Sequence, residues 1–411
     1  MSLPTAAAAA TIAKAALPLT AATTTTTFIP RQTFDASTST ARSYFLGHHH
    51  AALSRMRQAL SSVNLLIECR DFRVPLTSWN PLLERSLLAT APTRPGSAGA
   101  AGLGTRRIIV YTHRDLGPPR GPRIDAAISA LRAFHATHPS TAGVLFLGAD
   151  TTKSGDGALL AAIKRVARDV DALTGLRAMV VGMPNAGKST LLNRLRARGL
   201  GLPKAARTGA EPGVTRKLGT AVRIVGREGD GRDGETAGMG EGVFVVDTPG
   251  VFIPYVSRAE DMLKLALVGC VKDGIVPAVT VADYLLFHLN RDEEARGEYV
   301  SRFLAGEGQG PTNDVHEFLK GVAARTGKLT RGGELSLEAA AEWVVKEWRR
   351  GGMGKFMLDE VNEETLGLAV EAAKKPELSL NQAKKKGKEA RRVKNEMKRF
   401  GMEPSAATVS E

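Results

Sequence analysis

The sequence predicts an α/β fold with a mainly parallel sheet, followed by a small α-helical domain, and three observations support that prediction. Apolar, β-rich runs alternate with helix-like stretches ahead of about Val281. One of these runs passes through a glycine-containing loop directly into a helix-like stretch. Beyond Val281 the apolar residues recur at helical spacing. Strands that alternate with helices are typical of parallel sheets, because each parallel connection needs a crossover segment.

The predicted strands are short apolar runs bounded by turn residues. Two glycine-rich segments, 94–105 and 226–242, have no periodicity and are predicted to be surface loops, the second of them linking two strands. The segment 336–350 places apolar residues on one face of a helix. The strand runs are VNLLIE at 63–68, RIIVYT at 107–112, GVLFLG at 143–148, AMVVG at 178–182 and GVFVVD at 242–247.

Composition divides the chain further. The first 42 residues hold alanine and threonine runs, with Asp35 as the sole acid, which is typical of a mitochondrial transit peptide or, alternatively, of a disordered tail. We expect an α/β domain over 43–280, an α-helical domain over 281–375 and a basic tail, helical or disordered, over 376–411. Within that tail, residues 381–400 carry nine basic residues against two glutamates, which fits a solvated helix or a contact with a phosphate backbone.

Charge and cysteine content restrict the class of protein. The 411 residues include 56 Lys and Arg against 42 Asp and Glu, a formal charge of +14, so the partner is expected to be polyanionic. Nucleic acid and an anionic membrane surface both satisfy that expectation. Two cysteines are too few for a disulfide framework, and no apolar run is long enough to predict a transmembrane segment.

The segment GMPNAGKS at 182–189 is a complete phosphate-binding loop between a strand-like run and a helix-like run. Its glycines allow the backbone amides and the helix N-terminus to face phosphate oxygens. Lys188 is expected to neutralise the β- and γ-phosphates and to act in catalysis, and Ser189 to offer its hydroxyl to Mg²⁺. The residues expected to contact the nucleotide here are Asn185, Ala186, Gly187, Lys188, Ser189 and Thr190.

A second motif, VVDTPG at 245–250, ends an apolar strand with an aspartate and a glycine-bearing turn. Asp247 is predicted to hold Mg²⁺ through water, and the Gly250 amide to sense the γ-phosphate, so that the next loop becomes a switch. Alone, the motif would read as an ordinary strand-to-turn junction. Between the two motifs, Thr215 offers a further hydroxyl ligand for Mg²⁺.

Guanine recognition needs an aspartate that accepts hydrogen bonds from the base, and no such element follows Asp247. One candidate precedes the phosphate-binding loop instead, because VYTHRDL at 110–116 places Thr112, His113 and Asp115 just after a predicted strand. The segment 148–157 begins at the end of another predicted strand and could form a loop beside the base.

In this order of motifs the chain resembles the circularly permuted GTPases that assist ribosome assembly, closest to their mitochondrial large-subunit branch. The resemblance covers roughly residues 43–375 and includes YFLGHH at 44–49, ECRDFRVPLTSWNP at 68–81, LKLALVGCVKDGIVP at 263–277 and residues 328–356. Joining the ends of a compact domain and opening another loop leaves its packing unchanged, so permutation is physically tolerable.

The resemblance implies guanine contact at Asp115, phosphate contact at Lys188, and Mg²⁺ contact at Ser189, Thr215 and Asp247. Thr112 and His113 stand where the family carries asparagine and lysine, so His113 would have to stack on the base or guanine affinity would fall. Val251 follows DTPG where other GTPases carry a water-orienting glutamine. The histidine of the family's GHM-like element corresponds to His48, which we expect to position water once a partner orders it; an inert surface histidine is the alternative.

The function predicted from these residues is a Mg²⁺-dependent GTPase that binds GTP and GDP, slow until a ribosome stimulates it. The resemblance implies assembly of the mitochondrial large ribosomal subunit, with the GTP state controlling contact with its rRNA. Its expected location is the mitochondrial matrix, with peripheral contact to the inner membrane. Two alternatives are an RNA-binding assembly scaffold whose nucleotide site has degenerated, and an ATPase with the same loop.

Overall fold

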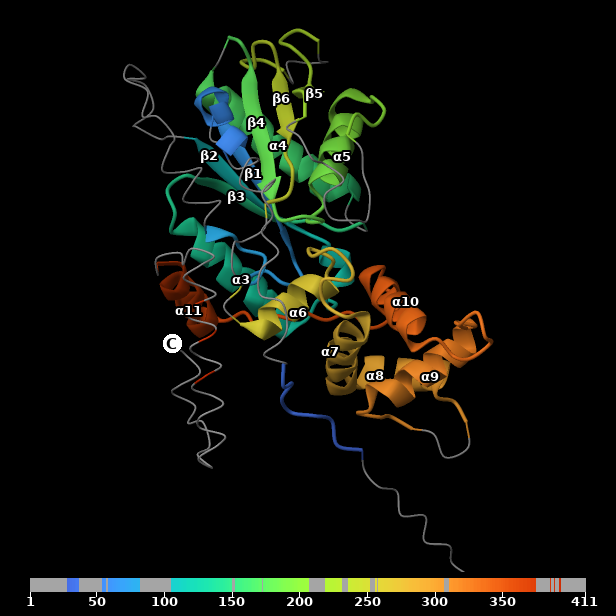
Figure 1. The fold of residues 1–411 in the computed structure, drawn as a ribbon. Coiled ribbons are helices and arrows are strands. Elements are labelled where there is room, and N and C mark those ends of the chain that lie inside the picture. The colour runs from blue at the N-terminus through green and yellow to red at the C-terminus, as the bar shows by residue number, and fades with distance from the viewer. Residues whose placement is uncertain are drawn as a thin grey trace, which may run out of the picture.

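The computed structural model describes residues 28–36, 54–56, 58–81, 105–149, 152–171, 173–206, 219–230, 236–251, 256, 258–306, 310–374, 385, 388 and 392. Within them, one sheet has helices on both of its faces, and a group of helices lies beyond one end of the strands (Figure 1).

The sheet has six strands in the order β3-β2-β1-β4-β6-β5. Neighbouring strands pair in parallel, except that β5 runs antiparallel to β6. The mainly parallel sheet is therefore confirmed, and the glycine-rich 226–242 segment connects β5 to β6 as predicted. The strands are β1 (Leu65–Asp71), β2 (Arg106–Thr112), β3 (Thr141–Phe146), β4 (Leu176–Gly182), β5 (Val222–Val225) and β6 (Val243–Asp247).

Both faces of the sheet are buried, which a parallel sheet of apolar strands requires. The helices α4 (Thr152–Val170) and α5 (Lys188–Leu200) pack on one face. The opposite face is covered by α3 (Pro122–Ala136), by α11 (Glu363–Lys374) and by Met56 and residues 58–63, which include the short helix η1 (Leu60–Ser62). Alternation along β1 supports both cores, since Ile67 faces one cluster and Leu66 the other.

A second apolar core belongs to the helices that follow β6. Their cluster runs from Val256 to Leu358 and also takes in Val74 and Met183 from the sheet domain. Side-chain caps begin three of these helices, at Asp292, Asp314 and Ser336. The helices are α6 (Ala259–Leu267), α7 (Ala278–Arg291), α8 (Glu293–Phe303), α9 (Val315–Thr326) and α10 (Leu337–Arg349).

The helix predicted at 336–350 is confirmed as α10, whose apolar face buries Val344 and Trp348. After it, the chain returns to the sheet domain, where Leu366 of α11 packs against Phe72 and Tyr111. The proposed domain limits at residues 280 and 375 stay a prediction. Within the described part of the chain, no helix is both long and apolar enough to cross a bilayer.

The register of the parallel strands gathers their carboxyl ends at one edge. Asp71 of β1 lies opposite Thr112 of β2, Cys69 lies opposite Gly182 of β4, and β6 ends at Asp247. Ligands of open α/β sheets bind in the crevice outside this edge. The predicted phosphate-binding, Mg²⁺-binding and base-binding residues therefore come from strands that end side by side.

Candidate functional site

The phosphate-binding loop connects β4 to α5 through backbone conformations that suit its residues. Gly182 has φ 141°, and a Cβ there would lie 2.3 Å from the carbonyl oxygen of Cys69. Asn185 and Gly187 are left-handed, with φ of 56° and 75°, a conformation that glycine and asparagine adopt most readily. The helix α5 begins at Lys188. Its N-terminus, where the backbone amides have no partner within the helix, is therefore suited to bind an anion.

Lys188 occupies the centre of this loop. Its ammonium donates to the carbonyl oxygens of Gly182 at 3.2 Å and Met183 at 2.6 Å, and the residue is only 6% exposed. Burial lowers the pKa of Lys188, whereas the nearby Asp247 carboxylate favours its charged form. A buried cation whose hydrogen bonds in the described structure go to neutral carbonyl oxygens gains by pairing with phosphate, which is the role predicted for this residue.

The predicted Mg²⁺ ligands Ser189 and Asp247 are in direct contact. The Ser189 hydroxyl donates to Asp247 Oδ2 at 2.5 Å, whereas Asp247 Oδ1 is buried and has no hydrogen-bond partner among the described residues. Burial raises the pKa of Asp247, against the opposing effects of the Ser189 hydrogen bond and the Lys188 charge. A hydroxyl and a carboxylate with one unpaired buried oxygen are donors that suit Mg²⁺. These residues therefore fit the predicted ion.

The DTPG turn lies against the phosphate-binding loop. A Cβ on Gly250 would lie 2.5 Å from the Cα and N of Pro184, so only glycine fits there. The Val251 amide donates to the carbonyl oxygen of Gly182 at 3.2 Å. Val251 itself is fully buried beside Met56, and an apolar buried side chain is unable to orient an attacking water. Hydrolysis therefore needs a water-positioning group from elsewhere.

The predicted base-recognition residues touch the same loop. Thr112 Oγ1 lies 3.2 Å from the carbonyl oxygen of Ala186, and a Cβ on Gly187 would lie 3.4 Å from Thr112 Cγ2 and 3.7 Å from His113 Cε1. Asp115 follows in the short helix η2 (Arg114–Leu116), half-buried and without a side-chain hydrogen bond to the other described residues. Its carboxylate is thus available as an acceptor.

His113 is held by a residue that the sequence analysis did not single out. Its Nδ1 lies 3.0 Å from Asp71 Oδ2 and 3.2 Å from Thr112 Oγ1, and its backbone is left-handed at φ 56°. Asp71 also accepts three hydrogen bonds from Arg73, two of them from the guanidinium. Burial alone would raise the pKa of Asp71, but Arg73 and His113 together hold that pKa well below its usual range.

The site is connected to the helical cluster at two places. The Arg73 guanidinium lies 4.9 Å from the ring centroid of Trp348 in α10. Asn185 Nδ2 donates to the carbonyl oxygen of Gly269 at 2.7 Å, in the turn after α6. Arg349 of α10 donates to the carbonyl oxygens of Ala266 and Leu267 at the end of α6, which holds the start of that turn in place.

The structure brings most of the predicted site together. Lys188, Ser189, Asp247, Gly250 and the Thr112–His113 pair surround one loop, whereas Thr190 is exposed on the first turn of α5. His48 and Thr215 lie outside the described residues. Asp71 and Arg73 were not predicted as site residues, although an acid and a base two residues apart at the end of a predicted parallel strand would have indicated them.

Comparison with known proteins gives the following similarities. Residues 177–305 match the family model described as 50S ribosome-binding GTPase. The chain is 33% identical over 335 residues to Mitochondrial GTPase 1 of Schizosaccharomyces japonicus, covering 78% of this chain and 91% of the relative. The corresponding Schizosaccharomyces pombe protein is 33% identical over 351 residues, covering 82% and 95%. Mitochondrial ribosome-associated GTPase 1 of Ictalurus punctatus is 29% identical over 348 residues, covering 80% and 96%.

Proposed function

The chain belongs to the Mitochondrial GTPase 1 family and is a circularly permuted GTPase, and from this premise we propose that it assists assembly of the mitochondrial large ribosomal subunit. In this proposal the GTP-bound protein binds the subunit and its rRNA, and hydrolysis releases it. The observation that best supports nucleotide dependence is the contact of Ser189 with Asp247 beside the buried Lys188.

The phosphate chemistry of the proposal rests on these side chains and the loop amides. Lys188 and the first turn of α5 would hold the β- and γ-phosphates, and Ser189, Asp247 and Thr215 would hold Mg²⁺. The ion supplies positive charge that offsets charge developing on the phosphoryl oxygens. Phosphoryl transfer needs little covalent help from protein, so positioning and charge account for most of the catalysis.

We assign the positioning of water to His48. The supporting observation is that Val251, which follows DTPG, is buried and apolar, so the described residues next to the γ-phosphate position offer no such group there. Met56 lies eight positions after His48 and belongs to the same apolar cluster as Val251. Slow intrinsic turnover follows if that segment is positioned only when the ribosomal partner binds.

Communication between nucleotide and ribosome would pass through the helical cluster. The Asn185–Gly269 hydrogen bond and the Arg73–Trp348 contact connect the nucleotide loops to α6 and α10. The basic tail at 376–411 and the formal charge of +14 support contact with rRNA phosphates. The leader-like first residues and the mitochondrial relatives support a mitochondrial location, within which the proposal places the protein in the matrix with peripheral contact to the inner membrane.

The proposal is tested by measuring GTP hydrolysis with and without purified mitochondrial large subunits. We expect the subunits to stimulate turnover at least tenfold, His48→Ala to remove most of the stimulation, and His49→Ala to retain it. Lys188→Ala is the control without nucleotide binding. Normal GTP binding without any stimulation would contradict a role on the ribosome, and absence of GTP binding would instead indicate an RNA-binding scaffold.

A further inference from the structure

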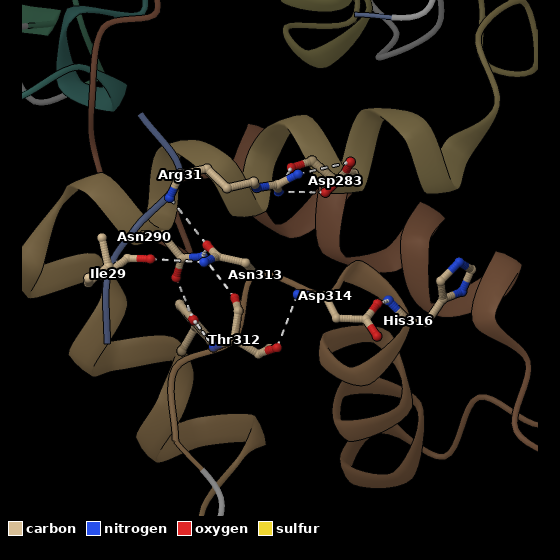
Figure 2. Close-up of polar contacts among 9 residues, drawn as sticks. Ile29, Arg31, Asp283, Asn290, Thr312, Asn313, Asp314 and His316 are labelled. Carbon is tan, nitrogen blue, oxygen red and sulfur yellow. Dashed lines mark hydrogen bonds and ion pairs between the residues drawn. The ribbon is translucent and has the colours of Figure 1, made fainter. Parts of the chain in front are cut away.

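Residues 28–36 lie against the helical cluster although composition places them in a removable leader. Their polar contacts are with α7 and with the 312–314 loop that leads into α9 (Figure 2). Phe34 and Ala36 pack on the apolar core of that cluster. We propose that any leader removed from this chain ends before Phe28, and that residues 28–36 remain in the mature protein as a strap across the helical domain.

The main chain of the strap is held by one asparagine side chain. Asn313 Nδ2 donates to the carbonyl oxygen of Ile29 at 2.9 Å, and Asn313 Oδ1 lies 3.4 Å from the amide nitrogen of Arg31, which donates to it (Figure 2). An amide that serves a carbonyl and an N–H two residues apart imitates the pairing of a neighbouring strand. Pro30 favours an extended conformation at Ile29, because the residue before proline is disfavoured in the helical region.

Asn313, which hydrogen-bonds the strap, is itself held by a buried hydrogen-bond network. Asn290 of α7, fully buried, donates to the carbonyl oxygen of Thr312 at 2.8 Å and to Asn313 Oδ1 at 3.3 Å. The Tyr299 hydroxyl donates to Asn290 Oδ1 at 2.6 Å. Asp314 then caps α9 by accepting from the His316 amide. A site prepared in this way needs little reorganisation to hold the strap, which favours binding.

Side chains at both ends of the strap add charge and aromatic contacts. Arg31 pairs with Asp283 of α7, with Nη2 2.6 Å from Oδ1. Phe34 lies edge-on to Tyr284 at 5.1 Å between centroids and tilted to Phe287 at 5.7 Å. Removal of the strap would therefore leave Asp283 without this cation and would expose the aromatic surface of α7 to water.

The two possible ends of the leader have different consequences. Cleavage after residue 42 would discard all of these contacts, whereas cleavage before Phe28 would keep them. The reaction is hydrolysis of one peptide bond by a processing endopeptidase and water, which leaves a carboxylate on the leader and an amine on the mature chain. This inference rests on the proposed import into mitochondria, but its structural part does not.

The processing site is tested by N-terminal sequencing and intact mass of the protein recovered from mitochondria. We expect a mature N-terminus that lies beyond residue 2 and at or before Phe28, and an N-terminus at residue 29 or later would overturn the proposal. A full-length chain recovered from mitochondria would contradict a removable leader, and recovery only outside mitochondria would contradict the proposed location. Either of these last two results would overturn the leader part of the proposal, and thermal unfolding of truncated chains tests the strap separately.

The strap is tested by thermal unfolding of chains that begin at Phe28 and at residue 37. We expect the chain from Phe28 to match the full chain and the chain from residue 37 to lose several degrees, or to fail to fold. In the chain from Phe28, Phe34→Ala should lower the midpoint by about 2–8 °C, and the exposed Gln32→Ala should leave it unchanged. Arg31→Asp should lower it, and adding Asp283→Arg should restore it. Equal midpoints for all these chains would overturn the strap.

Discussion

The Thr112 hydroxyl, at the end of β2, lies 3.2 Å from the carbonyl oxygen of Ala186, inside the phosphate-binding loop. This contact joins the base-recognition candidate directly to the phosphate site. The same hydroxyl is 3.1 Å from the carbonyl oxygen of Arg70, so its single proton is shared between two carbonyl oxygens, and His113 Nδ1 lies 3.2 Å away. A threonine thus ties together the two loops that a guanine nucleotide would span.

Replacing that hydroxyl tests whether the tie contributes to nucleotide binding. Thr112→Val keeps the side-chain shape and removes the donor, so the Ala186 carbonyl loses a partner worth about 1 kcal/mol. We expect the Kd for GTP to rise roughly five- to tenfold, while Thr112→Ser stays near wild type. Titration with a fluorescent GTP analogue measures both values. Equal affinities for the valine and serine variants would show that the hydroxyl has no part in binding.

Asp71 should make stability depend on pH in the acid range. Its folded pKa lies below its unfolded value of about 3.9. The carboxylate therefore stabilises the fold fully above that value and loses the contribution as the pH falls below it. Denaturant unfolding of the wild type at pH 7 and at progressively lower pH below 4 should show this loss.

The matched variant is Asp71→Asn, which leaves Arg73 buried without its carboxylate. We expect a loss of about 3–5 kcal/mol at neutral pH and a shallower decline of stability in acid. The exposed Asp230→Asn serves as a control, because its side chain hydrogen-bonds only the local Arg227 amide in the described structure. An unchanged acid profile in Asp71→Asn would assign the pH dependence to other carboxylates.

Removal of Mg²⁺ should abolish turnover, because the positive charge that offsets charge developing on the phosphoryl oxygens is then lost. We expect hydrolysis to stop in excess EDTA and to return when Mg²⁺ is added. Ser189→Ala should raise the Mg²⁺ concentration needed for half-maximal activity by roughly 10-fold or more. Ser189→Thr keeps the hydroxyl and should restore the wild-type requirement. Turnover that persists in EDTA would contradict the metal assignment.

The sheet was predictable from sequence because buried strands are read locally. Each of the five apolar runs became a strand, and the GMPNAGKS loop joins β4 to α5 as its glycines require. The proximity of Ser189 and Asp247 also followed from the topology, since β4 and β6 are neighbouring parallel strands and the loop after β4 therefore begins beside the end of β6.

Contacts between distant segments were not predictable. His113 pairs with Asp71 from another strand, and nothing in the local sequence of either residue specifies that pair. Composition likewise gave no sign that Phe34 packs on Tyr284, because the alanine and threonine runs that precede residues 28–36 dominate the count. Such contacts depend on tertiary packing, whereas periodicity and composition report only local preference and burial.

The central claim is that Asp115 recognises guanine from a loop that precedes the phosphate-binding loop in the sequence. The decisive measurement is competition of GTP, ATP and XTP for the chain from Phe28 and for its Asp115→Asn variant. We expect the unmodified chain to prefer GTP, and the variant to lose GTP affinity at least tenfold while gaining affinity for XTP, because its amide donates where the carboxylate accepted. Unchanged GTP preference in the variant would contradict the account.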